Sequence, residues 1–260
     1  MGADCFFRMG ASHQVCQDYA AVGESNGNVY AALSDGCSSS KDSDFGARFL
    51  VKAALQSHEG SRLDRFSVIA GANAMAHTVP VERAALDATL LTVGVCGDEV
   101  RAQRLGDGVI VSRDRGGVTV YNTISFDNNM PQYLSYGLSF ANMERYRSMV
   151  RNVTITSGVL GGPEFQDTMS LGSLRDLETI MHDRRHVDLV LLFSDGIESF
   201  QDEHGELIPL PVVLEEFMQF KGYAGQFIAR RCTRFLKDAA KRGWTHADDL
   251  SCAGVYLEAP

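Results

Sequence analysis

The order of strand-like and helical segments is the feature that most limits how this chain can fold. Runs rich in β-branched residues follow one another through the middle of the chain, whereas helical periodicity occurs early and late. Strict alternation of strands with helices, which is typical of a doubly wound parallel sheet, is absent. The order therefore predicts an α+β protein in which antiparallel sheets are covered by helices.

The predicted strands cover residues 18–22, 29–33, 88–95, 100–105, 109–113, 118–123, 149–156, 188–193 and 251–257. Predicted helices cover residues 45–54, 66–73, 212–220 and 224–242, the last ending at Gly243. Residues 125–147 are rich in Asn and Tyr without clear periodicity, which predicts a surface flap or insertion. Because no stretch resembles a linker, we expect one domain over residues 1–260, with the flap at about 125–147.

The charge balance limits the partners of the chain. With 24 Lys and Arg against 33 Asp and Glu, the formal net charge is −9, which argues against general binding of nucleic acid or of an anionic membrane. The six cysteines show no Cys-x-x-Cys spacing, and the N-terminus lacks the apolar core of a signal peptide. We therefore expect a soluble, reduced, cytoplasmic protein that has no membrane-spanning segment.

Three predicted strands end in an aspartate that is followed by glycine: Asp35, Asp107 and Asp195. A hairpin turn explains Asp107 equally well, because another apolar strand follows it at once. Polar loop follows Asp35 and Asp195 instead, so each would hold a charge beside the core, where it needs a partner. No nearby run of Lys or Arg offers one, and a shared cation is the simplest answer.

Two further acidic positions lie at strand ends. Asp18 opens an early strand, and the pair Asp248 and Asp249 enters the last one. Carboxylate oxygens are the ligands that Mg²⁺ and Mn²⁺ prefer. The combined set is therefore the composition expected of an all-oxygen metal site.

In their order along the chain, these pieces resemble the metal-dependent serine/threonine protein phosphatases of type 2C, and most of all a bacterial branch of that family. The similar pieces span nearly the whole chain and lie at residues 12–13, 17–18, 33–36, 87–90, 105–108, 192–196 and 248–251. The resemblance implies a four-layer α-β-β-α sandwich of two antiparallel sheets flanked by helix pairs. It also implies a mobile flap beside the active site and a phosphoprotein substrate that a serine/threonine kinase supplies.

The resemblance further implies a centre of two, or with a weaker site three, Mn or Mg ions. Asp35 would bridge two ions with the Gly36 carbonyl as a further ligand, Asp195 and Asp248 would hold one ion, Asp18 the other, and Asp107 with Asp195 the third. A water bridging the ions would attack phosphoserine or phosphothreonine in line, so no side chain is expected as nucleophile.

The chain departs from the family pattern at positions that matter for catalysis. His13 stands where many members have a phosphate-binding Arg and becomes the candidate phosphate contact. Cys37 replaces a His that many members carry as a proposed acid, so leaving-group protonation would fall to water. Two alternatives stay open: a non-catalytic sensor or binding module of the same fold, and a phosphoesterase for small molecules.

Overall fold

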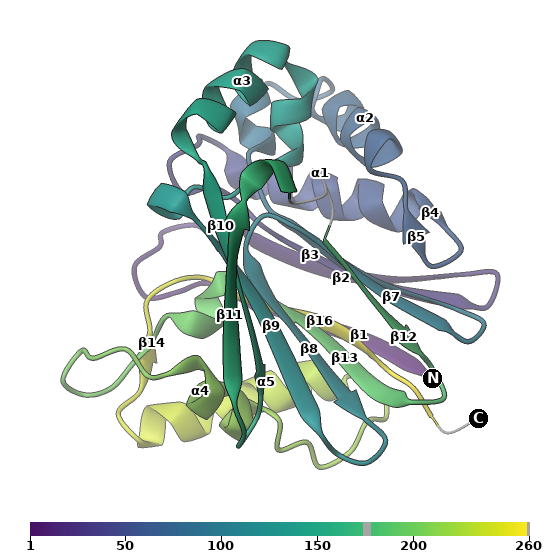
Figure 1. Ribbon diagram of the computed structural model, residues 1–260, viewed down its shortest axis with the longest axis vertical. Helices are drawn as coiled ribbons and strands as arrows, with labels where there is room; N and C mark the ends of the chain where they lie inside the picture. Colours follow the sequence, from purple (N-terminus) through teal and green to yellow (C-terminus); the bar gives the residue numbers. More distant parts are fainter. Residues whose placement is uncertain (174–177, 259–260) are drawn as a thin grey trace.

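Two antiparallel sheets lie face to face at the centre of the molecule, and helices cover both outer faces (Figure 1). The computed structural model describes residues 1–173 and 178–258. The architecture confirms the predicted four-layer α-β-β-α sandwich. No helix in these described ranges is both long and apolar enough to cross a membrane.

The larger sheet has seven strands in the order β1-β16-β13-β8-β9-β10-β11. Their bounds are β1 Gly2–Arg8, β8 Gly108–Asp114, β9 Thr119–Phe126, β10 Asn152–Val159, β11 Glu164–Ser170, β13 Val187–Phe193 and β16 Leu250–Tyr256. The last strand along the chain, β16, is thus an inner strand, paired with β1 on one side and with β13 on the other.

The smaller sheet has five strands in the order β12-β7-β6-β3-β2. Their bounds are β2 Asp18–Ser25, β3 Asn28–Asp35, β6 Leu90–Cys96, β7 Glu99–Leu105 and β12 Glu178–Asp183. Two short pairs complete the strands: β4 His58–Glu59 with β5 Arg62–Leu63, and β14 Phe200–Gln201 with β15 Thr245–His246.

Five α-helices and five short 3₁₀ helices lie in the described ranges. The α-helices are α1 Ser43–Gln56, α2 Arg65–Ala76, α3 Phe140–Met149, α4 Leu210–Phe217 and α5 Phe227–Lys241. The 3₁₀ helices are η1 Arg83–Leu86, η2 Asp127–Asn129, η3 Leu134–Leu138, η4 Leu171–Ser173 and η5 Asp195–Glu198. The helix α5 ends at Lys241, and the predicted cap residue Gly243 follows it with a φ of 77°, which lets the Trp244 amide bond back to the Ala239 carbonyl at 3.0 Å.

Apolar side chains form one buried layer between the sheets and one under each helix pair. Leu33, Val93, Ile110 and Val190 belong to the layer between the sheets. The helices α1 and α2 bury Leu50 and their other apolar residues on the outer face of the smaller sheet, whereas α4 and α5 cover the larger sheet. These packed layers therefore set the positions of the strand ends from which the loops begin.

The structure differs from the sequence predictions at several elements. The strands β1, β11 and β12 were not predicted, and β10 begins at Asn152 because Met149 still belongs to α3. The segment predicted as a flap contains two 3₁₀ helices and α3. Tyr146 of α3 is buried with Phe126 and Val153, which gives this segment a small apolar core of its own.

Candidate active site

The predicted acidic residues come together at one end of the two sheets. Asp18 is the first residue of β2 and Asp35 the last of β3, and the two are direct partners in the strand register. Asp195 follows β13 and begins η5, and Asp248 lies two residues before β16. The smaller sheet therefore contributes one pair of carboxylates and the larger sheet another.

Asp107 lies where the chain passes from one sheet to the other. The strand before it, β7, belongs to the smaller sheet, and the strand after it, β8, belongs to the larger one. The hairpin explanation of the Gly-Asp-Gly sequence is therefore wrong. This crossing brings Asp107 close to Asp195, whose charge raises the pKa of Asp107.

The electrostatics of the carboxylates show how close together they lie. Burial, followed by the charges of Asp18, Asp195 and Asp107, holds the pKa of Asp35 well above its usual value. Burial is also the main reason that the pKa of Asp18 and that of Asp107 rise to about 7. The pKa of Asp195 is raised by burial and by the charge of Asp248. Asp18 is fully buried and Asp35, Asp107 and Asp195 are partly buried, so these carboxylates repel one another when nothing neutralises them.

The donor set fits a hard divalent cation. One carboxylate oxygen of Asp18 and one of Asp195 are buried without a hydrogen-bond partner in the described structure, although buried polar atoms normally have one. Oxygen donors of this kind suit Mg²⁺ and Mn²⁺. However, across residues 1–173 and 178–258 no three His, Cys, Asp or Glu side chains stand in an arrangement that could hold an ion as it is. The carboxylates would have to move together around an ion.

A short hydrogen-bond chain fixes the end of β13 against Asp18. The Ser194 hydroxyl donates to Asp18 Oδ2 at 2.7 Å and accepts from the Ser251 amide at 2.9 Å. The next turn is tightly packed, since a Cβ atom on Gly196 would lie 1.7 Å from the Asp249 carbonyl oxygen. Glycine after Asp195 is therefore required by close backbone approach.

Asp249 has a different role from its acidic neighbour Asp248. Its carboxylate is buried and accepts from the amides of Gly10 and Gln17 at 2.8 and 2.6 Å. His13 Nδ1 lies 2.9 Å from the same carboxylate, and His13 Nε2 lies 3.4 Å from Asp248 Oδ1. Asp249 thus anchors the loop before β2, and both nitrogens of His13 face carboxylates.

His13 is therefore biased toward its charged form. Burial alone would lower the pKa of this imidazole, but the hydrogen bond to Asp249 and the charges of Asp249 and Asp248 outweigh it and raise the pKa. A cationic His13 neutralises part of the acidic pair beside it.

Sequence reasoning missed two residues around this site. Glu198 lies one turn after Asp195 in η5, and burial together with the charge of Asp195 raises its pKa to about 7. Tyr133 lies beside Cys37, and burial, Cys37, Asp107 and Asp35 raise the pKa of its hydroxyl. Only the helical spacing of Glu198 after Asp195 is a signal that could have been found in the sequence.

Asp87 connects the site to the segment between β9 and β10. Its two carboxylate oxygens accept from the hydroxyls of Ser135 and Ser40 at 2.5 and 3.3 Å. Its carbonyl accepts from the Cys37 amide at 2.9 Å. This hydrogen bonding places η3 and Tyr133 at the edge of the carboxylate group.

Comparison with known proteins shows the family of this chain. A family model described as Protein phosphatase 2C matches residues 9–225, well over half of the 260-residue chain. The chain belongs to the protein phosphatase 2C family. Asp248 lies beyond the matched residues, so its place at the site rests on the geometry described above. A search of curated proteins found none whose sequence matches this chain.

Solved structures of protein phosphatases share the fold. A bacterial serine phosphatase has a TM-score of 0.57 at 14% identity, covering 100% of this chain and 99% of its own. Stp1 from Staphylococcus aureus has a TM-score of 0.56 at 14% identity, with 98% and 94% covered. The Mycobacterium tuberculosis serine/threonine phosphatase PstP/Ppp has a TM-score of 0.53 at 14% identity, with 99% and 98% covered. At such low identity these similarities show the fold alone.

Proposed function

We propose that this protein phosphatase 2C family member is a metal-dependent hydrolase that removes phosphate from phosphoserine and phosphothreonine of cytoplasmic proteins and so opposes a serine/threonine kinase. The observation that supports the proposal is the group of partly or fully buried, mutually repelling carboxylates at the ends of both sheets. Such a group costs stability unless a ligand neutralises it.

The proposed ligand roles follow the positions of the carboxylates. Asp35, which interacts with Asp18, Asp195 and Asp107, would contact both ions, with the Gly36 carbonyl beside it. Asp195 and Asp248 would hold one of these ions, and Asp18 would hold the other. Asp107 and Asp195 would hold a third ion more weakly. When bound, Mn or Mg ions would supply a water of lowered pKa and neutralise charge on the phosphoryl oxygens.

The remaining residues would orient the ligands and the substrate. Ser194 fixes one oxygen of Asp18 and leaves the other for a ligand. His13 would hold Asp248 and Asp249 in place, and its Nε2 is the atom that can turn toward a phosphate. We propose no protein nucleophile, and water would protonate the leaving group.

The test compares isosteric variants of the wild-type protein. We expect the wild type to hydrolyse p-nitrophenyl phosphate and a phosphothreonine peptide with Mn²⁺ and to lose this activity with a chelator. Asp35→Asn and Asp195→Asn should each lower kcat/KM by roughly 100-fold or more. Asp167→Asn, at an exposed position of β11, is the matched control and should keep full activity. Absence of activity throughout, or equal activity in all variants, contradicts the proposal.

A non-catalytic member of the fold is the second candidate, and the engagement of His13 with the acidic pair favours it. Calorimetric titration with Mn²⁺ separates the two candidates. A folded protein that binds no Mn²⁺ would be a module without catalytic activity, whereas two bound ions per chain support the phosphatase.

A further inference from the structure

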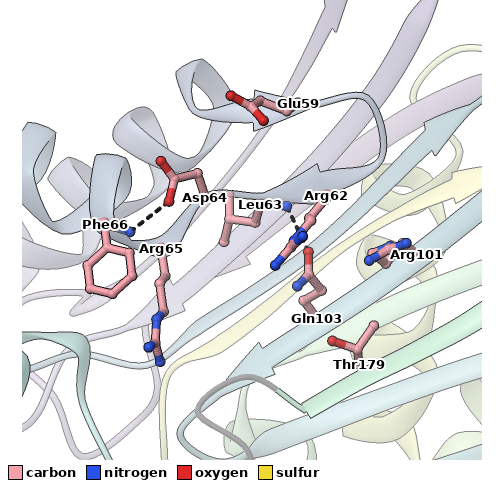
Figure 2. Close-up of a pocket in the computed structure, with 9 residues that line it drawn as sticks. All are labelled: Glu59, Arg62, Leu63, Asp64, Arg65, Phe66, Arg101, Gln103 and Thr179. Atoms are coloured by element: carbon pink, nitrogen blue, oxygen red, sulfur yellow. Dashed lines mark hydrogen bonds between the residues drawn. The ribbon is translucent and has the colours of Figure 1, made fainter.

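An arginine-lined cleft lies on the outer face of the smaller sheet, apart from the carboxylate group (Figure 2). It has a volume of about 470 Å³ and lies between the β4–β5 hairpin, the first turn of α2 and the strand β7. Its basic residues are Arg62, Arg65 and Arg101. Three guanidinium groups therefore lie around one cleft in a chain of net charge −9.

The acidic side chains at this cleft are directed elsewhere. Asp64 caps α2 by accepting from the Phe66 amide at 3.1 Å, and in Figure 2 its carboxylate and that of Glu59 point away from β7. The Arg62 side chain makes no hydrogen bond or ion pair with any described residue, although its charge acts on the neighbouring Asp64. Arg101 donates hydrogen bonds from Nε and Nη2 to Glu99, which leaves its Nη1 without a hydrogen bond to a described residue. The cleft therefore offers charged donors to an anionic ligand.

A smaller apolar pocket continues from the cleft toward the active site. It has a volume of about 140 Å³ and shares Arg65 and Phe66 with the cleft. Its other walls include Leu105 and Tyr133, and Tyr133 lies at the edge of the carboxylate group. Phe66 is 67% exposed at the junction of the two cavities. Together they form one groove that leads away from the carboxylates.

The strand β7 sets the length of this groove. Arg101, Gln103 and Leu105 alternate along the strand and so share its outer face, and Asp107 follows two residues later. At about 3.3 Å per residue, the distance from Asp107 is roughly 13 Å to Gln103 and roughly 20 Å to Arg101. An extended peptide covers that distance with about four to six residues.

We propose that this groove binds an acidic segment of the substrate protein, about four to six residues from its phosphorylated residue. An apolar substrate side chain would occupy the pocket at Leu105 and Tyr133, and acidic side chains would bind Arg62 and Arg101. The inference rests on the proposed function, because it assigns the substrate class of that same site.

Matched phosphopeptides test the preference. We expect kcat/KM to be roughly tenfold higher for a peptide with two Glu residues at that spacing than for the same peptide with Ala, mainly through KM. Arg62→Glu and Arg101→Glu should remove the difference, as should high salt. Lys237→Glu is the control, because it changes the net charge by the same amount at an exposed position of α5, which covers the other sheet. This variant should keep the preference for the acidic peptide. Hydrolysis of p-nitrophenyl phosphate should be equal in all four proteins.

A binding measurement separates this inference from the proposed function. Fluorescence anisotropy with the unphosphorylated acidic peptide requires no hydrolysis, and we expect at least fivefold weaker binding to Arg62→Glu than to the wild type. The proposal that the groove binds acidic peptides is overturned if both proteins bind the peptide equally, or if Arg62→Glu retains the peptide preference. Either result holds even if the enzyme is active. Binding of inorganic phosphate but not of the peptide would make the cleft a small-anion site and also overturn it.

Discussion

At the residue scale, the carboxylates of the candidate active site oppose the stability of the protein that surrounds them. Asp18, Asp35 and Asp195 are drawn from separate strands into a site where burial and mutual repulsion raise their pKa values. Selection for stability alone would replace at least one of them. Their combination is understandable if a cation completes the site.

We therefore predict that Asp35→Asn stabilises the metal-free protein while it removes activity. The amide keeps the size of the side chain and removes one of the repelling charges, so the free energy of unfolding should rise by about 1–3 kcal/mol. Thermal denaturation in the presence of a chelator measures the change. Asp167→Asn should leave the melting temperature unchanged, and destabilisation by Asp35→Asn would contradict the prediction.

His58 provides a separate prediction about pH. It stacks on Tyr30 with ring centroids 4.3 Å apart, and burial lowers its pKa from 6.5 to about 4. The unfolded chain binds this proton more readily, so the stability contributed by neutral His58 is complete above pH 6.5 and is lost as the pH falls toward 4.

The variant His58→Phe keeps an aromatic ring but cannot titrate. Between pH 7 and pH 4, its free energy of unfolding should fall by on the order of 2 kcal/mol less than that of the wild type. Urea denaturation at both pH values measures the difference. An identical pH dependence in the two proteins would show that His58 does not titrate as its burial implies.

At the element scale, one buried arginine connects the two sheets. Arg104 of β7 donates from Nη1 to the carbonyls of Gly108 and Asn122 at 2.7 and 2.9 Å, and from Nε to Glu178 of β12 at 2.9 Å. Four strands, two from each sheet, therefore meet at one guanidinium group. Its positive charge also opposes the rise that burial causes in the pKa of Asp107 and of Glu198, and so partly offsets the acidic site.

We predict that Arg104→Met destabilises the fold by about 3–5 kcal/mol, because it leaves the partly buried Glu178 and two carbonyl oxygens without their donor. Chemical denaturation of the wild type and the variant measures this. The double variant Arg104→Met/Glu178→Gln should recover part of the loss, since it removes the unpaired charge. A loss below 1 kcal/mol in the single variant would show that the connection is not structural.

The elements that sequence reasoning missed share a physical cause. β1, β11 and β12 are all edge strands, and β11 is almost entirely exposed, so none carries the buried apolar pattern by which inner strands were predicted. The helix α3 buries only Tyr146 and therefore has little apolar periodicity. Elements packed on a core were predictable, whereas those held mainly by hydrogen bonds were not.

The residues of the candidate site also fall into a group that the sequence predicted and a group that it did not. Asp18, Asp35, Asp107, Asp195 and Asp248 were recognisable because each lies at a strand end, where a charge is conspicuous beside apolar residues. Their assigned ligand roles stay predictions. Tyr133 and the link from Asp87 to Ser135 depend on how a distant segment folds back, which no local pattern in the sequence encodes.

At the scale of the whole molecule, we predict that divalent ions stabilise the protein by much more than a salt of equal ionic strength does. Two bound ions would change the formal net charge from −9 to −5, and saturation at 100 times Kd corresponds to about 2.7 kcal/mol per independent site. Differential scanning calorimetry with Mn²⁺, against NaCl of equal ionic strength, measures the shift. A chelator should reverse it, and an equal shift with NaCl would contradict it.

The position of β16 has a consequence for how the protein is made. This strand pairs with both β1 and β13, and the residues just before it include Asp248 and the anchor Asp249. A growing polypeptide must therefore keep β1 apart from the rest of its sheet until residues 250–256 have left the ribosome. Until then the nascent chain would lack the complete group of carboxylates and would stay open to chaperones.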